Sequence, residues 1–155
     1  MSNTQILGDL ELSEESRIPQ IVLNWLNSCS RLPAGPIRYE VLPIGIPGMC
    51  MSPTRATYIS RRYIYGGYLA HFHVLLTYRI QPGDSGSERL NAEAALNAIG
   101  EWATDPSNYK TLFGEGLNVR RAYILYRSNI TNAFDNGDED HSITFTLTYE
   151  VMKPL

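Results

Sequence analysis

The sequence has little of what usually marks a metal centre, a disulfide framework or a membrane protein. It contains only two cysteines, Cys29 and Cys50, and they lack the short spacing of metal-binding or redox pairs. We therefore expect two free thiols in a reducing compartment. No apolar run approaches the ~20 residues of a membrane span, and residues 1–16 lack the charged-then-apolar pattern of a signal peptide. These absences predict a chain that makes no disulfide and has no contact with a membrane.

An excess of basic charge is also missing. Lysine and arginine number 13 against 16 acidic residues, which gives a net charge of −3 and no general footprint for binding nucleic acid. Apolar residues make up 43% of the chain and charged residues 19%, a balance typical of a globular protein rather than a disordered one. A chain of 155 residues can bury about two thirds of its unfolded surface without help from disulfides or structural metals. We therefore predict one domain that spans residues 1–155.

The clearest pattern lies in residues 68–80, where side chains alternate between an apolar and a mixed face. Gly66-Gly67 precedes this segment and Gln81-Pro82-Gly83 follows it. Because successive strand residues face opposite sides of a sheet, the alternation predicts a long central strand that is covered on one side. The apolar face comprises Tyr68, Ala70, Phe72, Val74, Leu76, Tyr78 and Ile80, and the mixed face comprises Leu69, His71, His73, Leu75, Thr77 and Arg79.

Two other segments have the spacing of helices. The first starts at Ser13, a good N-cap followed by two glutamates, and ends near Ser30. The second covers residues 88–104 and stops at Asp105-Pro106. Their expected buried faces are Ile18, Ile21, Val22, Trp25, Leu26 and Cys29 in the first helix, and Leu90, Ala94, Ala95, Ala98, Ile99 and Trp102 in the second.

The remaining patterns complete an α+β fold with a mainly antiparallel sheet of four to five strands and two helices packed on its apolar face. Residues 142–152 alternate clearly and predict the last strand. Residues 1–12 are expected to form a flexible arm, and the proline- and glycine-rich residues 43–54 an extended loop without regular structure. The other expected strands are 37–42, 56–65 and 117–127, with a loop at 106–116 and an acidic hairpin loop at 133–141.

No pattern in the sequence indicates catalysis or a bound cofactor. It contains no nucleophile elbow, phosphate-binding glycine loop or acid–base pair. His71 and His73 have a spacing that suits a metal, but only His141 and distant carboxylates could complete the site. We therefore interpret the two histidines as a polar strand face or a subunit contact. The acids at 135–140 lack the spacing of a calcium loop, which favours a solvated hairpin tip.

Residues 61–102 and 142–152 resemble the tail terminator proteins of long-tailed bacteriophages, which are often labelled minor capsid or minor tail proteins. The resemblance begins with a basic segment, Arg62-Tyr63-Ile64 followed by Gly66, and an aromatic strand that ends in Arg79. It continues with Asn91, which opens a helix finishing in Glu101-Trp102, and with an aromatic last strand. That strand carries Phe145 and Tyr149.

The resemblance implies a structural virion protein, assembled in the host cytoplasm, that forms a homo-oligomeric ring, expected to be a hexamer, at the head-proximal end of the tail tube. Its partners would be other copies of itself, the major tail tube protein and the head–tail connector or stopper protein, with DNA only as passing cargo. Tyrosine and arginine are enriched in buried interface anchors. The expected interface residues are Arg61, Arg62, Tyr63, Tyr65, Tyr78, Arg79, Arg121 and Tyr123. We expect Asp135, Asp138, Glu139 and Asp140 to face the central channel, where they would repel the DNA backbone.

Two alternatives remain open at this point. The chain could be another component of the phage neck, such as a head-completion or stopper protein, which would also form a ring. It could instead be a small ligand- or metal-binding α+β domain that uses the face of His71 and His73.

Overall fold

The computed structural model describes residues 12–151 except 34, 55–57 and 84–85. The predicted arm at 1–12 therefore lies outside the described residues, apart from Leu12. The elements follow in the order α1 (Leu12–Asn27), β1 (Ile37–Tyr39), β2 (Gly48–Pro53), β3 (Tyr58–Arg62), β4 (Tyr68–Ile80), α2 (Gly86–Thr104), α3 (Pro106–Tyr109), the 3₁₀ helix η1 (Lys110–Glu115), β5 (Asn118–Ala133) and β6 (Glu139–Val151).

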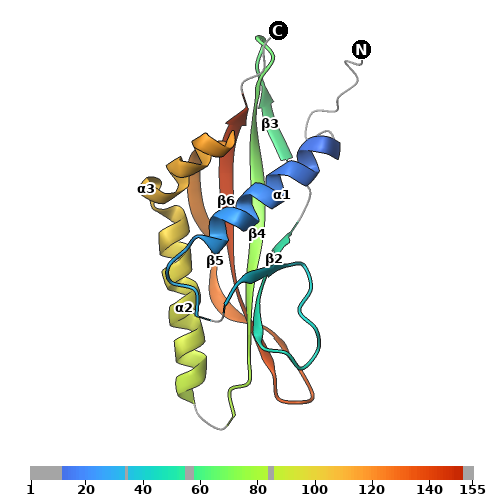
Figure 1. Cartoon of the computed structure of the whole chain (residues 1–155), viewed down its shortest axis with the longest axis vertical. Coiled ribbons are helices and arrows are strands. Elements are labelled where there is room, and N and C mark those ends of the chain that lie inside the picture. Colours follow the sequence, from blue (N-terminus) through green and yellow to red (C-terminus); the bar gives the residue numbers. More distant parts are fainter. Residues whose placement is uncertain (1–11, 34, 55–57, 84–85, 152–155) are drawn as a thin grey trace.

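The fold is α+β, as predicted, with a mostly antiparallel sheet (Figure 1). Its strand order is β1-β2-β4-β6-β5, and β3 also pairs with β4. The sheet therefore has six strands, one more than the upper end of the predicted range, and only β1 and β2 run parallel. The long strand β4 lies in the middle and pairs with β6 along its whole length.

Both helices that were predicted, α1 and α2, pack on one face of this sheet, which we call the inner face. The inward residues predicted for β4 and β6 are confirmed, because Tyr68, Phe72, Phe145 and Tyr149 are buried completely or nearly so. The other face is less open than we expected from a strand covered on one side, since Thr144 and Thr146 are buried as well. In α1 the predicted stripe is confirmed as well, with only Ile21 partly exposed. The core therefore lies between the helices and the inner face, and the opposite face of the sheet carries no helix (Figure 1).

The prediction for residues 43–54, a loop without regular structure, is wrong for the second half of the segment. Residues 48–53 form β2, which pairs with β4 from Gly48 opposite Arg79 to Pro53 opposite Val74. The prolines do not interfere, because Pro47 precedes the strand and Pro53 is its last residue. Proline is excluded from the middle of a strand but not from its ends.

The buried face of α2 is a second correction. The helix buries Ala92, Leu96, Ile99, Gly100 and Ala103, whereas Leu90 of the predicted face is 67% exposed. Alanines occur on several sides of this helix, so the apolar spacing alone does not decide which side meets the sheet. The helix lies close to the sheet at Gly100, where a β-carbon would lie 2.7 Å from Cδ1 of Ile143.

We predicted a loop at 106–116, but residues 106–115 are helical. Asp105 caps α3 by accepting a hydrogen bond from the backbone N–H of Ser107, and Pro106 occupies the first helical turn, where its missing donor costs least. Together with the 3₁₀ helix η1 this segment continues the helical layer beyond α2.

Candidate functional site

The helix-free side of the sheet, which we call the outer face, carries a ladder of polar cross-strand pairs between β4 and β6. His71 Nδ1 lies 3.0 Å from Thr148 Oγ1, and His73 Nδ1 lies 2.8 Å from Thr146 Oγ1. Further along, the hydroxyls of Thr77 and Ser142 are 3.0 Å apart. These pairs satisfy one another, so the middle of the outer face is polar and internally bonded, and Thr146, Ser142 and Thr77 are buried there.

Among the described residues, no third metal-ligating side chain completes a site with the two histidines. His141 lies on the inner face, where its Nε2 is 3.2 Å from Glu139 Oε1. Within the part of the chain that the structure describes, no group of three or more His, Cys, Asp or Glu side chains is placed to hold a metal ion. His71 and His73 instead each pair with a threonine of β6, as side chains on a polar strand face do.

Burial lowers the pKa of His71, because the charged imidazolium loses hydration in the folded protein. Protonation therefore favours the unfolded chain, so the contribution of His71 to stability is complete above its unfolded pKa, about 6.5, and is lost as the pH falls below it. We predict that the free energy of unfolding decreases between about pH 7 and pH 5 by less in His71→Gln than in the wild type. Urea unfolding at a series of pH values measures this difference, and two parallel pH profiles would contradict it.

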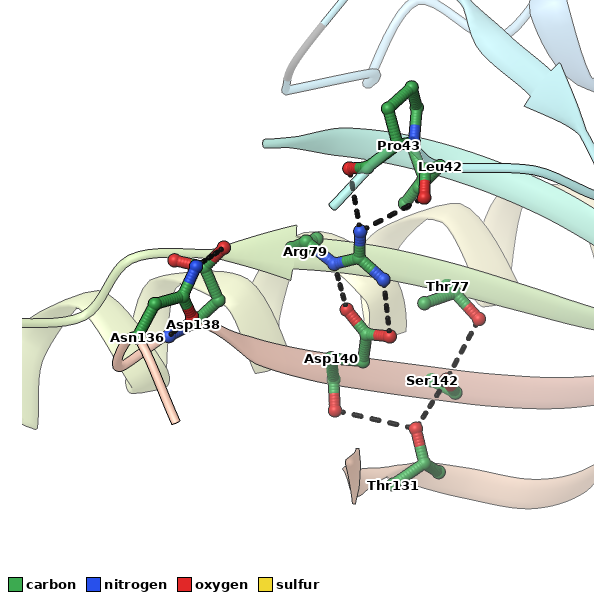
Figure 2. A network of polar contacts seen from close by, with 9 residues as sticks. All are labelled: Leu42, Pro43, Thr77, Arg79, Thr131, Asn136, Asp138, Asp140 and Ser142. Atoms are coloured by element: carbon green, nitrogen blue, oxygen red, sulfur yellow. Dashed lines mark hydrogen bonds and ion pairs between the residues drawn. The ribbon is translucent and has the colours of Figure 1, made fainter. Parts of the chain in front are cut away.

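Arg79 occupies the far end of the same ladder and connects β4 to β6 and to the loop before β2 (Figure 2). Its Nε and Nη2 donate to the two carboxylate oxygens of Asp140 at 2.8 and 3.1 Å, and Nη1 donates to the carbonyls of Leu42 and Pro43. The guanidinium carbon also lies 4.6 Å from the ring centroid of Phe134. Hydrogen bonding to Asp140 raises the pKa of Arg79, which keeps this buried group charged.

Arg79 and Asp140 therefore require corrections to our expectations. Arg79 was predicted at a partner interface, but it is only 7% exposed and its donors are engaged within the chain. Asp140 was predicted to face a channel, but it is buried against Arg79. Both residues link β4, β6 and the loop before β2, which is a structural role.

Two of the other acids that we predicted to face a channel are also bonded within the chain, so they do not form a free acidic loop tip. Asp138 is buried and accepts a hydrogen bond from Asn136 Nδ2. Glu139 accepts from Arg89 at 2.6 to 3.0 Å, and this hydrogen bonding lowers the pKa of Glu139. Because Glu139 and Asp140 belong to β6, the turn is shorter than the predicted loop at 133–141. Of the four acids only Asp135 is exposed, and its place relative to a channel stays a prediction.

Most of the predicted tyrosines and arginines meet at the opposite end of the sheet, near the hairpin between β3 and β4. Tyr63 and Tyr65 stack with ring centroids 5.0 Å apart, and the hydroxyl of Tyr63 donates to Glu150 Oε2 at 2.5 Å. This hydrogen bond is the main reason why the pKa of Tyr63 is raised. The turn closes through a bond from Gly66 N to the carbonyl of Tyr63, with Gly66 at φ 105°, a conformation that suits glycine.

Strand β5 contributes arginines to the same area. Arg120 Nη1 lies 3.8 Å from Glu150 Oε1, and the guanidinium of Arg121 lies 4.6 Å from the ring centroid of Tyr123. Arg121 is in register with Thr148, which faces outward beside His71. On the β3 side, Arg61 is in register with Leu69 and is exposed. We call this group the Arg–Tyr patch: Arg61, Tyr63, Tyr65, Arg120, Arg121 and Tyr123.

The structure thus brings together five of the eight predicted interface residues and separates three. Tyr78 packs partly buried against the inner core, and Arg79 lies at the other end of β4. Arg62 is in register with the inward Tyr68 and stacks over its ring at 5.9 Å. The sequence analysis missed Arg120 and Glu150, because their connection depends on the pairing of β5 with β6.

Both cysteines are free and buried, as predicted, and burial raises the pKa of the Cys50 thiol. Among the described residues, no helix is long and apolar enough to cross a membrane. A scan against protein-family models finds no match to this chain, and a search of curated proteins finds none either.

Proposed function

We propose that this chain is a structural virion protein of the tail terminator type, which forms a homo-oligomeric ring on the head-proximal end of a tail tube. The observation that carries the proposal is the Arg–Tyr patch. It presents stacked tyrosine and arginine side chains on a sheet whose own polar groups are bonded internally. Preorganised aromatic and arginine side chains are the usual anchors of protein–protein interfaces.

The free edge of β5 adds support. In the described part of the chain, β5 is the last strand of the sheet, and no strand pairs with the edge that faces away from β6. The exposed side chains of β5 include Leu125, Tyr126 and Ile130. Large exposed apolar side chains gathered on one strand indicate contact with another molecule. A ring provides such contacts on both sides of each copy, and the tube and the head-side connector provide the contacts above and below.

The test is to assemble tail tubes from the major tail tube protein of the same phage, with and without this chain. A terminator stops polymerisation, so we predict that its addition shortens the tubes and places one ring at a single end of each tube. Electron microscopy measures both the length distribution and the position of the ring. Tubes of unchanged length, or rings that bind only isolated connectors, would contradict the proposal and favour another neck component.

A further inference from the structure

The two layers of the molecule carry opposite charge. The helical segment at 86–115 contains five acids, Glu88, Glu93, Glu101, Asp105 and Glu115, against two basic residues, Arg89 and Lys110. All five acids are exposed, and Arg89 is already bound to Glu139. Glu101 forms an exposed ion pair with Arg31 at 3.9 Å, which leaves most of its side chain open to solvent. In contrast, the Arg–Tyr patch carries three exposed arginines, and Glu150 at its centre is only 19% exposed along its side chain. A chain of net charge −3 therefore has a basic area on its sheet side and an acidic helical layer.

The acidic layer also has an apolar centre. On α2, Leu90 is 67% exposed, and Ala94, one turn further along the helix, is exposed as well. Glu93 and Glu101 flank this centre on the exposed side of α2. An apolar centre with a charged rim is the common anatomy of a protein interface. The Arg–Tyr patch likewise combines aromatic rings with arginines beside them.

We infer that the Arg–Tyr patch of one copy docks on the acidic helical layer of a second copy, around Glu93 and Glu101. The inference rests on the proposed function and names the contact that would build the ring. The patch lies on the outer face, whereas α2 covers the inner face, so each copy can contact one neighbour through each layer (Figure 1). Contacts between two different surfaces generate rings or filaments, whereas a surface that pairs with itself generates a closed dimer.

A second copy fits the patch better than nucleic acid does. The arginines are spread around a partly buried glutamate, with which Arg120 is already paired, rather than forming a continuous basic stripe. The remaining surface is acidic overall and repels a polyanion at long range. The complementary acidic surface, by contrast, is present on every copy of the chain.

The experiment is a charge swap in the full-length chain. The sheet variant carries Arg120→Glu and Arg121→Glu, and the helix variant carries Glu93→Arg and Glu101→Arg. Like charges placed across an interface are strongly unfavourable, so we expect the association constant of each variant alone to fall by at least about tenfold. A one-to-one mixture restores opposite charges at every contact, and we expect it to assemble as the wild type does. Mass photometry at low salt measures the populations.

Arg38→Glu is the matched control, because it makes the same change in charge as one sheet substitution but lies exposed on β1, at the opposite edge of the sheet from β5. We expect it to leave association undiminished. A mixture that stays dissociated overturns the inference, and so does a wild-type chain that remains monomeric at low salt. Binding of duplex DNA that the sheet variant loses, with assembly unchanged, overturns it in favour of a nucleic-acid surface.

The tube assay separates this inference from the proposed function. If swapped copies assemble with each other but do not limit tube length, the contact is supported and the terminator function fails. If the wild type limits tube length but the swap does not restore assembly, the function is supported and the contact fails.

Discussion

Replacing Arg79 with methionine is expected to lower the free energy of unfolding by about 3–5 kcal/mol, because the substitution leaves a buried carboxylate without its partner. The side chains of Arg79 and Asp140 are only 9% and 12% exposed, so water cannot replace the lost bonds. The carbonyls of Leu42 and Pro43 lose a donor as well, and the loop before β2 loses its attachment to β4. Urea unfolding followed by fluorescence measures the change.

The double variant Arg79→Met with Asp140→Leu is the informative control. Removing both charges removes the penalty of an unpaired carboxylate, so we expect the double variant to be more stable than Arg79→Met alone. Arg120→Met provides a second comparison, because the side chain of Arg120 is 60% exposed and exposed ion pairs contribute about 1 kcal/mol or less. If Arg79→Met and Arg120→Met lowered the free energy of unfolding by the same amount, the contacts of Arg79 that Figure 2 shows would contribute no more than an exposed ion pair.

The elements that could be predicted from the sequence are those whose pattern has one interpretation. Residues 68–80 and 142–152 alternate without interruption, and the buried stripe of α1 has a single side, so the structure confirms them. Strand β2 was missed because prolines and glycines dominate its neighbourhood, and only pairing with β4 makes it a strand. The predicted face of α2 was right at Ile99 and wrong at Leu90, because alanine is compatible with both a buried and an exposed position and leaves the side of the helix undecided.

The candidate site was less predictable, for a physical reason. Composition shows that arginine and tyrosine are present, but whether a charge is free depends on partners far away in the chain. Arg79 and Asp140 are 61 residues apart, and Arg89 and Glu139 are 50 apart. The acids at 138–140 therefore look like an exposed cluster in the sequence and are bonded in the fold. The register between β5 and β6 likewise decides that Arg121 shares a face with His71.

Replacing Trp25 with alanine is expected to be the most damaging change in the helical layer. Trp25 is 6% exposed, its ring centroid lies 4.9 Å from that of Trp102, and its Nε1 donates to the carbonyl of Asn108 at 3.2 Å. One side chain therefore connects α1 to α2 and α3. Truncating a large buried aromatic side chain costs about 3–5 kcal/mol, and we expect a loss of unfolding free energy in this range.

Trp102→Ala is expected to cost less, since Trp102 is only partly buried against the core, although the sequence predicted it as a core residue. The cycle formed by Trp25→Ala, Trp102→Ala and the double variant should give a coupling of about 0.5–1.5 kcal/mol, the range for aromatic pairs in contact. Trp25→Phe keeps an aromatic ring but not the donor, and separates packing from the bond to Asn108. If Trp102→Ala destabilises the protein more than Trp25→Ala does, the side chain that joins the helices is Trp102. In that case α2, rather than α1, holds the helical layer on the sheet.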